Sequence, residues 1–187
     1  MNHINEIKQI CEKAAKPLSE VSIKGVKSYR TFDIDCQTLE EYDSKSIETA
    51  EKFKELFSQL KTVTGPVLYW FEIVSSIDNQ LIINELDKYR NSEDCKAVPA
   101  LKSNLDFNTK ALYVGKVKQL FRGRLIQHLG YQKGNKTQGL QLYYWTKSLP
   151  LKFKLHVYEF DNDIAELMSI VENAMAKELK PLIGKHK

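Results

Sequence analysis

The chain has 187 residues and a net charge of +4, with 42% hydrophobic and 28% charged side chains. This length suits one domain with a full core, or one domain with an extension, and the composition is ordinary for a soluble globular protein. No apolar run approaches the ~20 residues that a membrane span needs, and the first residues lack the profile of a secretory signal. The three cysteines are widely spaced, which fits free thiols better than a disulfide framework or a zinc site. We therefore expect a cytoplasmic protein with no membrane partner.

The first third of the chain, residues 1–62, predicts a mainly helical N-terminal extension. Apolar residues recur at three- and four-residue intervals over 4–15, which predicts a short helix that Pro17 ends. Residues 29–34 alternate weakly and fit either an edge strand or an extended arm. A continuous apolar stripe over 44–60 then predicts a core-packing helix.

Strands and helices alternate in the rest of the chain. Apolar runs and two-residue alternation predict strands at 67–74, 112–117 and 152–160. Helical periodicity and breaker residues predict helices at 80–90, 120–130 and 161–179. The first of these strands is almost wholly apolar, so we expect it to be central and covered on both faces.

Charge is unevenly distributed along the chain. Residues 107–158 contain no Asp or Glu in 52 positions but carry ten Lys or Arg, whereas the remainder holds 18 basic and 24 acidic side chains. A long window without an acid favours a surface that faces a polyanion over an ordinary solvated face. The cations expected to contact a nucleic-acid backbone are Lys118, Arg122, Lys133 and Lys136.

Groups suited to phosphodiester hydrolysis occur in this part of the chain. That reaction needs a group that deprotonates water, a cation for the charge developing on phosphate and usually a carboxylate for a divalent metal. Tyr69 and Tyr113 lie on neighbouring predicted strands, and Arg124 and His128 lie four residues apart on one helical face. Taken singly, these patterns are also typical of core tyrosines and a solvated helix face.

Two carboxylates of the last predicted helix are candidates for a metal site. Glu172 lies at the edge of the apolar arc and Glu178 nearer its centre, so composition does not choose between them. Magnesium prefers oxygen ligands and keeps several waters, so one carboxylate together with a substrate phosphate suffices.

The order and spacing of these residues resemble the GIY-YIG nuclease family. Val67-Leu68-Tyr69 resembles the first motif of that family, and Tyr113-Val114-Gly115 resembles the second. Arg124 and His128 resemble the arginine and histidine of the helix that follows. The resemblance extends from about residue 65 to the end of the chain.

The last helix carries the fifth landmark of the resemblance. Glu172 lies nine residues before Pro181 and resembles the metal-binding glutamate of the family, which precedes a helix-ending proline at a similar distance; this favours Glu172 over Glu178. The interval from the second motif to the arginine is one residue longer than in the family, so Arg122 remains a rival for the arginine role. The asparagine that often follows the proline in the family is replaced by Gly184.

The resemblance implies a small α+β domain in which helices flank a three-stranded antiparallel sheet. This domain would span 63–187, with an insertion at about 78–108, and the extension 1–62 would complete its core or contact DNA. The implied function is a metal-dependent DNA endonuclease that uses Mg²⁺ or Mn²⁺ on duplex or branched DNA. The family includes homing endonucleases, restriction enzymes, repair incision modules and structure-selective resolving nucleases. The alternative is a nucleic-acid-binding or assembly module that retains the fold but does not cleave.

The resemblance also implies a role for each residue. One of the two tyrosines, Tyr69 or Tyr113, activates water directly or with the help of the metal. Arg124 stabilises the charge on the pentacovalent phosphate, and the glutamate holds the metal. His128 orients a tyrosine or assists proton transfer, and Lys116 touches the scissile phosphate.

Overall fold

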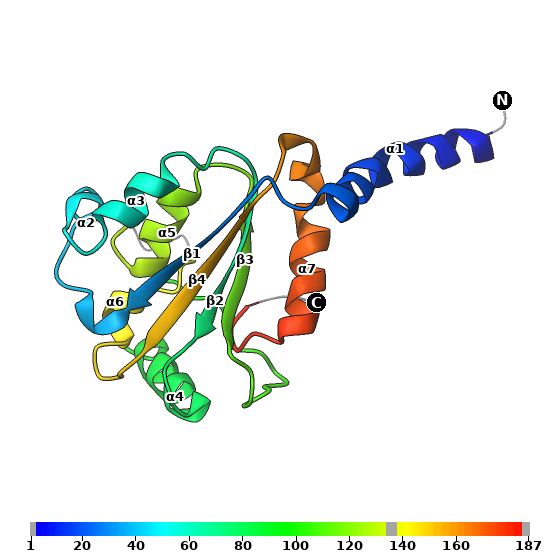
Figure 1. Ribbon diagram of the computed structural model, residues 1–187. Helices are drawn as coiled ribbons and strands as arrows, with labels where there is room; N and C mark the ends of the chain where they lie inside the picture. The colour runs from blue at the N-terminus through cyan, green and yellow to red at the C-terminus, as the bar shows by residue number, and fades with distance from the viewer. Residues whose placement is uncertain (1–2, 134–137, 185–187) are drawn as a thin grey trace.

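A four-stranded antiparallel sheet forms the centre of the molecule (Figure 1). The computed structural model describes residues 3–133 and 138–184. In spatial order the strands are β1 (Ser28–Asp35), β4 (Lys152–Glu159), β2 (Val67–Ile73) and β3 (Ala111–Val117). The protein therefore has the expected α+β class, but its sheet contains four strands where three were expected.

The additional strand comes from the N-terminal segment. β1 pairs with β4 along its whole length. Phe32 and Ile34 on one face of β1 are buried in the main core, whereas Tyr29 and Asp33 on the other face are exposed. The weak alternation over 29–34 thus belongs to an edge strand, since one face packs on the core and the other faces solvent.

Helices cover the two faces of the sheet unequally (Figure 1). The main core contains side chains from α2 (Ser46–Thr49), α3 (Lys54–Leu60), α4 (Asn79–Arg90), α5 (Phe121–Leu129) and α6 (Leu142–Trp145). A smaller core on the opposite face contains side chains from the 3₁₀ helix η2 (Asn162–Leu167) and from α7 (Met168–Leu179). β2 contributes to both, with Tyr69 and Phe71 in the main core and Leu68 in the smaller one, because successive side chains of a strand point to opposite faces.

Residues that follow β1 complete the main core. Ile47 of α2 and Phe57 of α3 are fully buried in the same cluster as Phe153 and Leu155 of β4. The expected single helix over 44–60 is wrong, because Ala50 adopts φ −58° and ψ 133° and thereby separates α2 from α3. Completion of the core is one of the two roles that we expected for the N-terminal extension.

The first helix, α1 (His3–Lys24), is longer than predicted and projects from the body of the molecule (Figure 1). Pro17 lies inside α1 instead of ending it. A proline removes one helical hydrogen bond, but no residue of α1 is buried, so water can satisfy the freed carbonyl. Only Leu18 and Val21 of this helix pack against the smaller core. None of the helices in the described ranges is long and apolar enough to span a membrane.

The C-terminal helix also begins differently from the prediction. Residues 162–167 form the 3₁₀ helix η2, and α-helical geometry starts only at Met168. After α7, the chain returns along β3, where the backbone N–H groups of Leu182 and Ile183 donate to the carbonyls of Ala111 and Leu112. This return brings the end of the described chain next to the tyrosine-bearing strand.

Candidate functional site

The two candidate tyrosines converge over a glycine. Tyr69 of β2 lies opposite Gly115 of β3, and Tyr113 lies two residues before Gly115 on the same face. The ring centroids of the tyrosines are 6.1 Å apart. A Cβ atom at Gly115 would lie 2.6 Å from the Tyr69 hydroxyl and 2.6 Å from Cε1 of Tyr113. Only a residue without a side chain allows the two phenols to meet at this position.

Helix α5 places two side chains on the hydroxyl of Tyr69. Arg124 Nε donates to Tyr69 Oη at 3.1 Å, and His128 Nε2 lies 2.7 Å from the same oxygen. Their four-residue spacing puts both on the helix face that packs on the sheet. Arg122, the rival for the arginine role, instead pairs with Glu48 of α2 at 3.0 Å. The structure therefore brings Arg124, and not Arg122, to the tyrosines.

A backbone contact determines which nitrogen of His128 carries the proton. The N–H of Leu140 donates to His128 Nδ1 at 3.1 Å. Burial, reinforced by the charge of Arg124, holds the pKa of His128 well below its usual range, so the ring is neutral and has a single N–H. Since Nδ1 accepts, the N–H is on Nε2 and points to Tyr69. The Tyr69 oxygen consequently accepts two hydrogen bonds, one from an imidazole and one from a guanidinium.

The two tyrosines differ in their access to solvent. Tyr69 is 0% exposed, and burial raises its pKa, an effect that the charge of Arg124 only partly opposes. Tyr113 is 8% exposed and is among the residues that line a pocket, whereas Tyr69 is not. Of the two tyrosines, Tyr113 is therefore the one that borders the space a substrate would occupy.

One pocket of about 200 Å³ brings the main candidate groups together. Tyr113 of β3, Arg124 of α5 and Glu172 of α7 all line it. Its remaining walls are Pro99, Gln138, Asn173 and Gly184. Because β3 is the outer strand of the sheet, a helix from each face can reach past its edge into the same space.

Glu172 provides the carboxylate of this pocket. Its Oε2 lies 3.9 Å from Nζ of Lys116, and 18% of its side chain is exposed. Glu178, the other carboxylate considered on this helix, is exposed and is not among the pocket residues. In the described part of the chain, no group of three or more His, Cys, Asp or Glu side chains could hold a metal. A single carboxylate in a pocket that Tyr113 and Asn173 also line fits a hard cation that takes most of its ligands from water and substrate.

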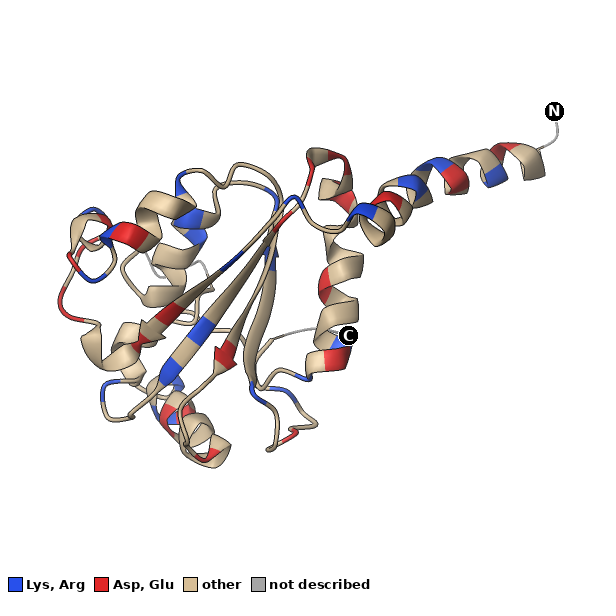
Figure 2. Cartoon of the chain, viewed as in Figure 1, with Lys and Arg blue, Asp and Glu red and all other residues tan. Residues whose placement is uncertain are grey.

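Folding brings acidic side chains against the basic window. Lys118 Nζ lies 2.7 Å from Glu166 of η2, and Arg122 lies 3.0 Å from Glu48 of α2. In Figure 2, acidic (red) and basic (blue) positions both occur along the sheet and on the helices around it. The sequence window therefore overstates the positive charge of the surface, because its cations meet acids from other segments. Lys133 is exposed, whereas Lys136 lies outside the described residues.

Several contributors to the site were not identified from the sequence. The carbonyl of Gln138 accepts a hydrogen bond from Arg124 at 2.7 Å, and the side chain of Gln127 accepts from the same guanidinium nitrogen. These acceptors hold the guanidinium beside the phenols. A backbone carbonyl leaves no trace in the sequence, and only the three-residue spacing from Arg124 could have indicated Gln127. Asn173 supplies a pocket amide, although the asparagine position of the family motif is Gly184.

A phenol, a guanidinium and a carboxylate thus line one small pocket. Behind them, a buried imidazole and a second phenol form a hydrogen-bonded support. No protein-family model, curated protein or solved structure matches this chain. The assignment of a function therefore depends on the geometry and chemistry of the pocket.

Proposed function

We propose that this protein is a metal-dependent DNA endonuclease of the GIY-YIG type. The observation that carries the proposal is the convergence of Tyr113, Arg124 and Glu172 on one pocket from β3, α5 and α7. A base, a cation and a metal-binding carboxylate are the groups that hydrolysis of a phosphodiester requires. The supporting contacts of Tyr69 and His128 favour a built site over a chance cluster of polar residues.

In the proposed reaction, water adds to phosphorus, one P–O ester bond breaks and the leaving oxygen takes up a proton. Tyr113 is the group that accepts the proton of the water. Arg124 presents a planar fork of donors to the phosphate oxygens in the transition state. Lys116 adds a second cation near the phosphate.

Tyr69 and His128 act as positioning residues. Neutral His128 donates a hydrogen bond to the Tyr69 oxygen, and Arg124 donates to the same oxygen. The hydrogen bond from His128 fixes the position of the phenol, and the phenol in turn orients the guanidinium of Arg124. The carbonyl of Gln138 accepts from another guanidinium nitrogen, Nη1 of Arg124. The guanidinium is therefore oriented before a substrate binds, which is the arrangement that stabilises developing charge without reorganisation.

Glu172 is the residue that would hold Mg²⁺ or Mn²⁺. A divalent cation there supplies electrostatic stabilisation of the charge that develops on the phosphate oxygens. Nζ of Lys116 lies 3.9 Å from Oε2 of this carboxylate. The position of Glu172 on a helix that packs on β3 keeps the carboxylate at the pocket wall.

Nicking of supercoiled plasmid tests the proposed function. The wild-type protein is expected to convert the plasmid to nicked and linear forms with Mg²⁺ or Mn²⁺, and EDTA is expected to stop the reaction. Glu172→Gln and Tyr113→Phe should each lower the rate by about 100-fold or more, because each removes a group that acts directly in the reaction. Glu178→Gln makes the same change on the exposed side of the same helix and should leave the rate unchanged.

Absence of cleavage would favour the alternative function, a module that does not cleave DNA. If the wild-type protein binds duplex and branched DNA but cleaves neither with either metal, it is a nucleic-acid-binding or assembly module that retains the fold. Equal activity in Glu172→Gln and Glu178→Gln would contradict the metal-binding role of Glu172.

A further inference from the structure

One edge of the central sheet lies open to solvent. In the spatial order β1-β4-β2-β3, the outer strands are β1 and β3. Among the described residues, β1 pairs with β4 alone, and Figure 1 shows no further strand on its outer side. The backbone N–H and C=O groups that point outward from β1 can therefore pair with another strand.

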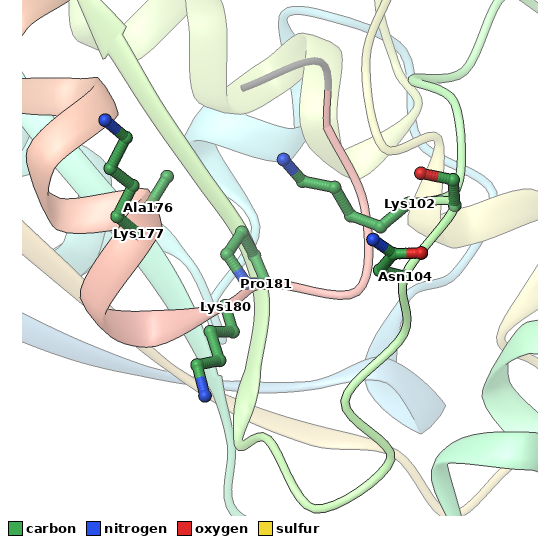
Figure 3. Close-up of a pocket in the computed structure, with 7 residues that line it drawn as sticks. Lys102, Asn104, Ala176, Lys177, Lys180 and Pro181 are labelled. Carbon is green, nitrogen blue, oxygen red and sulfur yellow. The ribbon is translucent and has the colours of Figure 1, made fainter. Parts of the chain in front are cut away.

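The opposite edge of the sheet is covered by the chain itself. The backbone N–H groups of Leu182 and Ile183 donate to carbonyls of β3 at 2.9 and 3.0 Å. The loop before β3 holds this C-terminal segment in turn, because the N–H of Lys102 donates to the carbonyl of Leu182 at 3.1 Å. Figure 3 shows Lys102 beside the segment that follows Pro181. In the described part of the chain, β1 is therefore the open edge of the sheet.

Strand β1 is suited to accept a partner strand. It is eight residues long and keeps one continuous register with β4, without the proline or the bulge that commonly blocks an exposed edge. Phe32 and Ile34 are buried in the main core, so the strand is already fixed in an extended conformation. On the other face, Tyr29, Thr31 and Asp33 are exposed and border the edge.

The charges of β1 favour antiparallel pairing with a second copy of the same strand. Arg30 and the preceding Lys27 lie at the start of β1, and Asp33 and Asp35 lie at its end. Parallel pairing of two copies would bring like charges side by side. Antiparallel pairing instead brings the basic start of one copy against the acidic end of the other, and opposite charges across strands are stabilising.

These charges also have partners within one copy. Glu159 contacts both Lys27 and Arg30, and Lys152 lies 2.9 Å from Asp35. The charges of β1 therefore determine the direction of pairing more than its strength. The affinity comes from the backbone hydrogen bonds that a second strand adds to the open edge.

Two-fold symmetry limits the register of such a pair. Residues opposite each other in an antiparallel pair point to the same face, so the axis between two identical strands passes beside one residue. An axis at Arg30 or at Asp33 would place like charges opposite each other. An axis at Thr31 avoids this, pairs the two threonines and sets Lys27 of one copy opposite Asp35 of the other.

We propose that two copies of this chain pair through β1, antiparallel, about a two-fold axis beside Thr31. Their sheets, of four strands each, then form one continuous sheet. Because β3 is covered in each copy, the pairing is isologous and stops at a dimer instead of extending into a fibre. This dimer does not depend on the proposed function.

The mass of the protein in solution tests the dimer. In sedimentation velocity runs at increasing protein concentration, the mass should rise from that of one chain, 21.6 kDa, toward twice that value. Thr31→Lys places two ammonium groups opposite each other at the axis and should raise the dissociation constant of the dimer by about tenfold or more. Thr49→Lys makes the same change at an exposed position on α2 and should leave the constant unchanged.

Disulfide cross-linking tests the register. In a Cys11→Ser/Cys95→Ser background, Thr31→Cys should form a disulfide-linked dimer on mild oxidation, because residues opposite each other on paired strands lie within the reach of a disulfide. Asp33→Cys is the control in the same strand. In this register its two copies lie four residues apart along the strands, roughly 14 Å, and should cross-link far less. Equal cross-linking of both variants would mean parallel or slipped pairing and would overturn the proposal.

The exposed apolar residues of α1 form the competing surface. Ile7 of this helix is 60% exposed, and Ile7→Lys should leave the dimer intact. If Ile7→Lys dissociates the dimer and Thr31→Lys does not, α1 is the interface and pairing through β1 is overturned. A wild-type protein that stays monomeric at every concentration overturns it as well.

Two further controls separate dimerisation from folding and from cleavage. Thr31→Lys should keep the far-UV circular dichroism of the wild type, and if this variant does not fold, the cysteine variants decide the register. Glu172→Gln should dimerise as the wild type does. A dimer without cleavage would therefore support pairing through β1 and contradict the nuclease proposal, whereas cleavage by a monomer would do the reverse.

Discussion

A buried carboxylate ties the N-terminal segment to the rest of the sheet. Glu159 at the end of β4 is 2% exposed. Its oxygens accept hydrogen bonds from the backbone N–H groups of Thr64 and Gly65, each at 3.1 Å, from the Ser28 hydroxyl at 2.9 Å and from Lys27 at 3.1 Å. These contacts join β1, β4 and the turn before β2, and Glu159→Gln removes the charge at their centre.

The size of the effect follows from the pKa of Glu159. Burial alone would raise the pKa, but hydrogen bonds from Gly65, Ser28 and Lys27 outweigh it and lower the value to about 2. An unfolded glutamate has a pKa of about 4.3, and the difference corresponds to roughly 3 kcal/mol. Because the folded value is the lower one, this stabilisation is fully present above about pH 4.3 and disappears as the pH falls through about 2. At about pH 3, roughly half of it should remain.

Urea unfolding of the wild-type protein and Glu159→Gln at several pH values measures this contribution. The difference in the free energy of unfolding should be about 3 kcal/mol at neutral pH and about half of that near pH 3. Glu178→Gln, at an exposed site, should differ little from the wild type at any pH. A Glu159→Gln difference that stays constant with pH, or that is below about 1 kcal/mol at neutral pH, would refute the reasoning.

Three further predictions concern the candidate site. Gly115→Ala places a methyl group 2.6 Å from the Tyr69 hydroxyl, so it should destabilise the protein by about 1–3 kcal/mol in urea unfolding and also slow nicking; unchanged stability would show that the phenols can separate. Arg124→Lys keeps the charge but loses the planar fork and should slow nicking by about 100-fold, whereas Arg122→Lys should have little effect; equal losses would argue against the assignment of the arginine. In ¹⁵N NMR spectra recorded across neutral pH, His128 should remain neutral with its proton on Nε2, and a titration near its ordinary pKa of about 6.5 would contradict the buried, neutral imidazole.

Local patterns identified most of the sheet. The apolar run at 67–74 and the alternation at 152–160 correspond closely to β2 and β4, because a central strand and a half-buried strand each leave a distinct mark in a short window. β1 stayed ambiguous at 29–34, since its partner β4 lies more than a hundred residues further along the chain and pairing cannot be read locally. The expected helix over 44–60 failed for a related reason, because its apolar stripe does not reveal that the backbone turns at Ala50.

For the candidate site too, the sequence predicted some of the residues, and only the structure showed how they are placed. Residue types and spacing were enough to propose Tyr69, Tyr113, Arg124 and His128, because strand alternation and helical periodicity are properties of neighbouring residues. The carboxylate was chosen from the sequence only by resemblance, and its place in the pocket became visible only after α7 was packed on β3.

The linear order of amino acids was sufficient for the α+β class, the main strands and a short set of reactive side chains, since each depends on local periodicity and residue chemistry. It could not reveal the neutral His128 that accepts from the Leu140 backbone, the different burial of the two tyrosines, or the pairing of Lys118 with Glu166. Those properties arise from contacts between distant segments, which burial and strand register create when the chain packs.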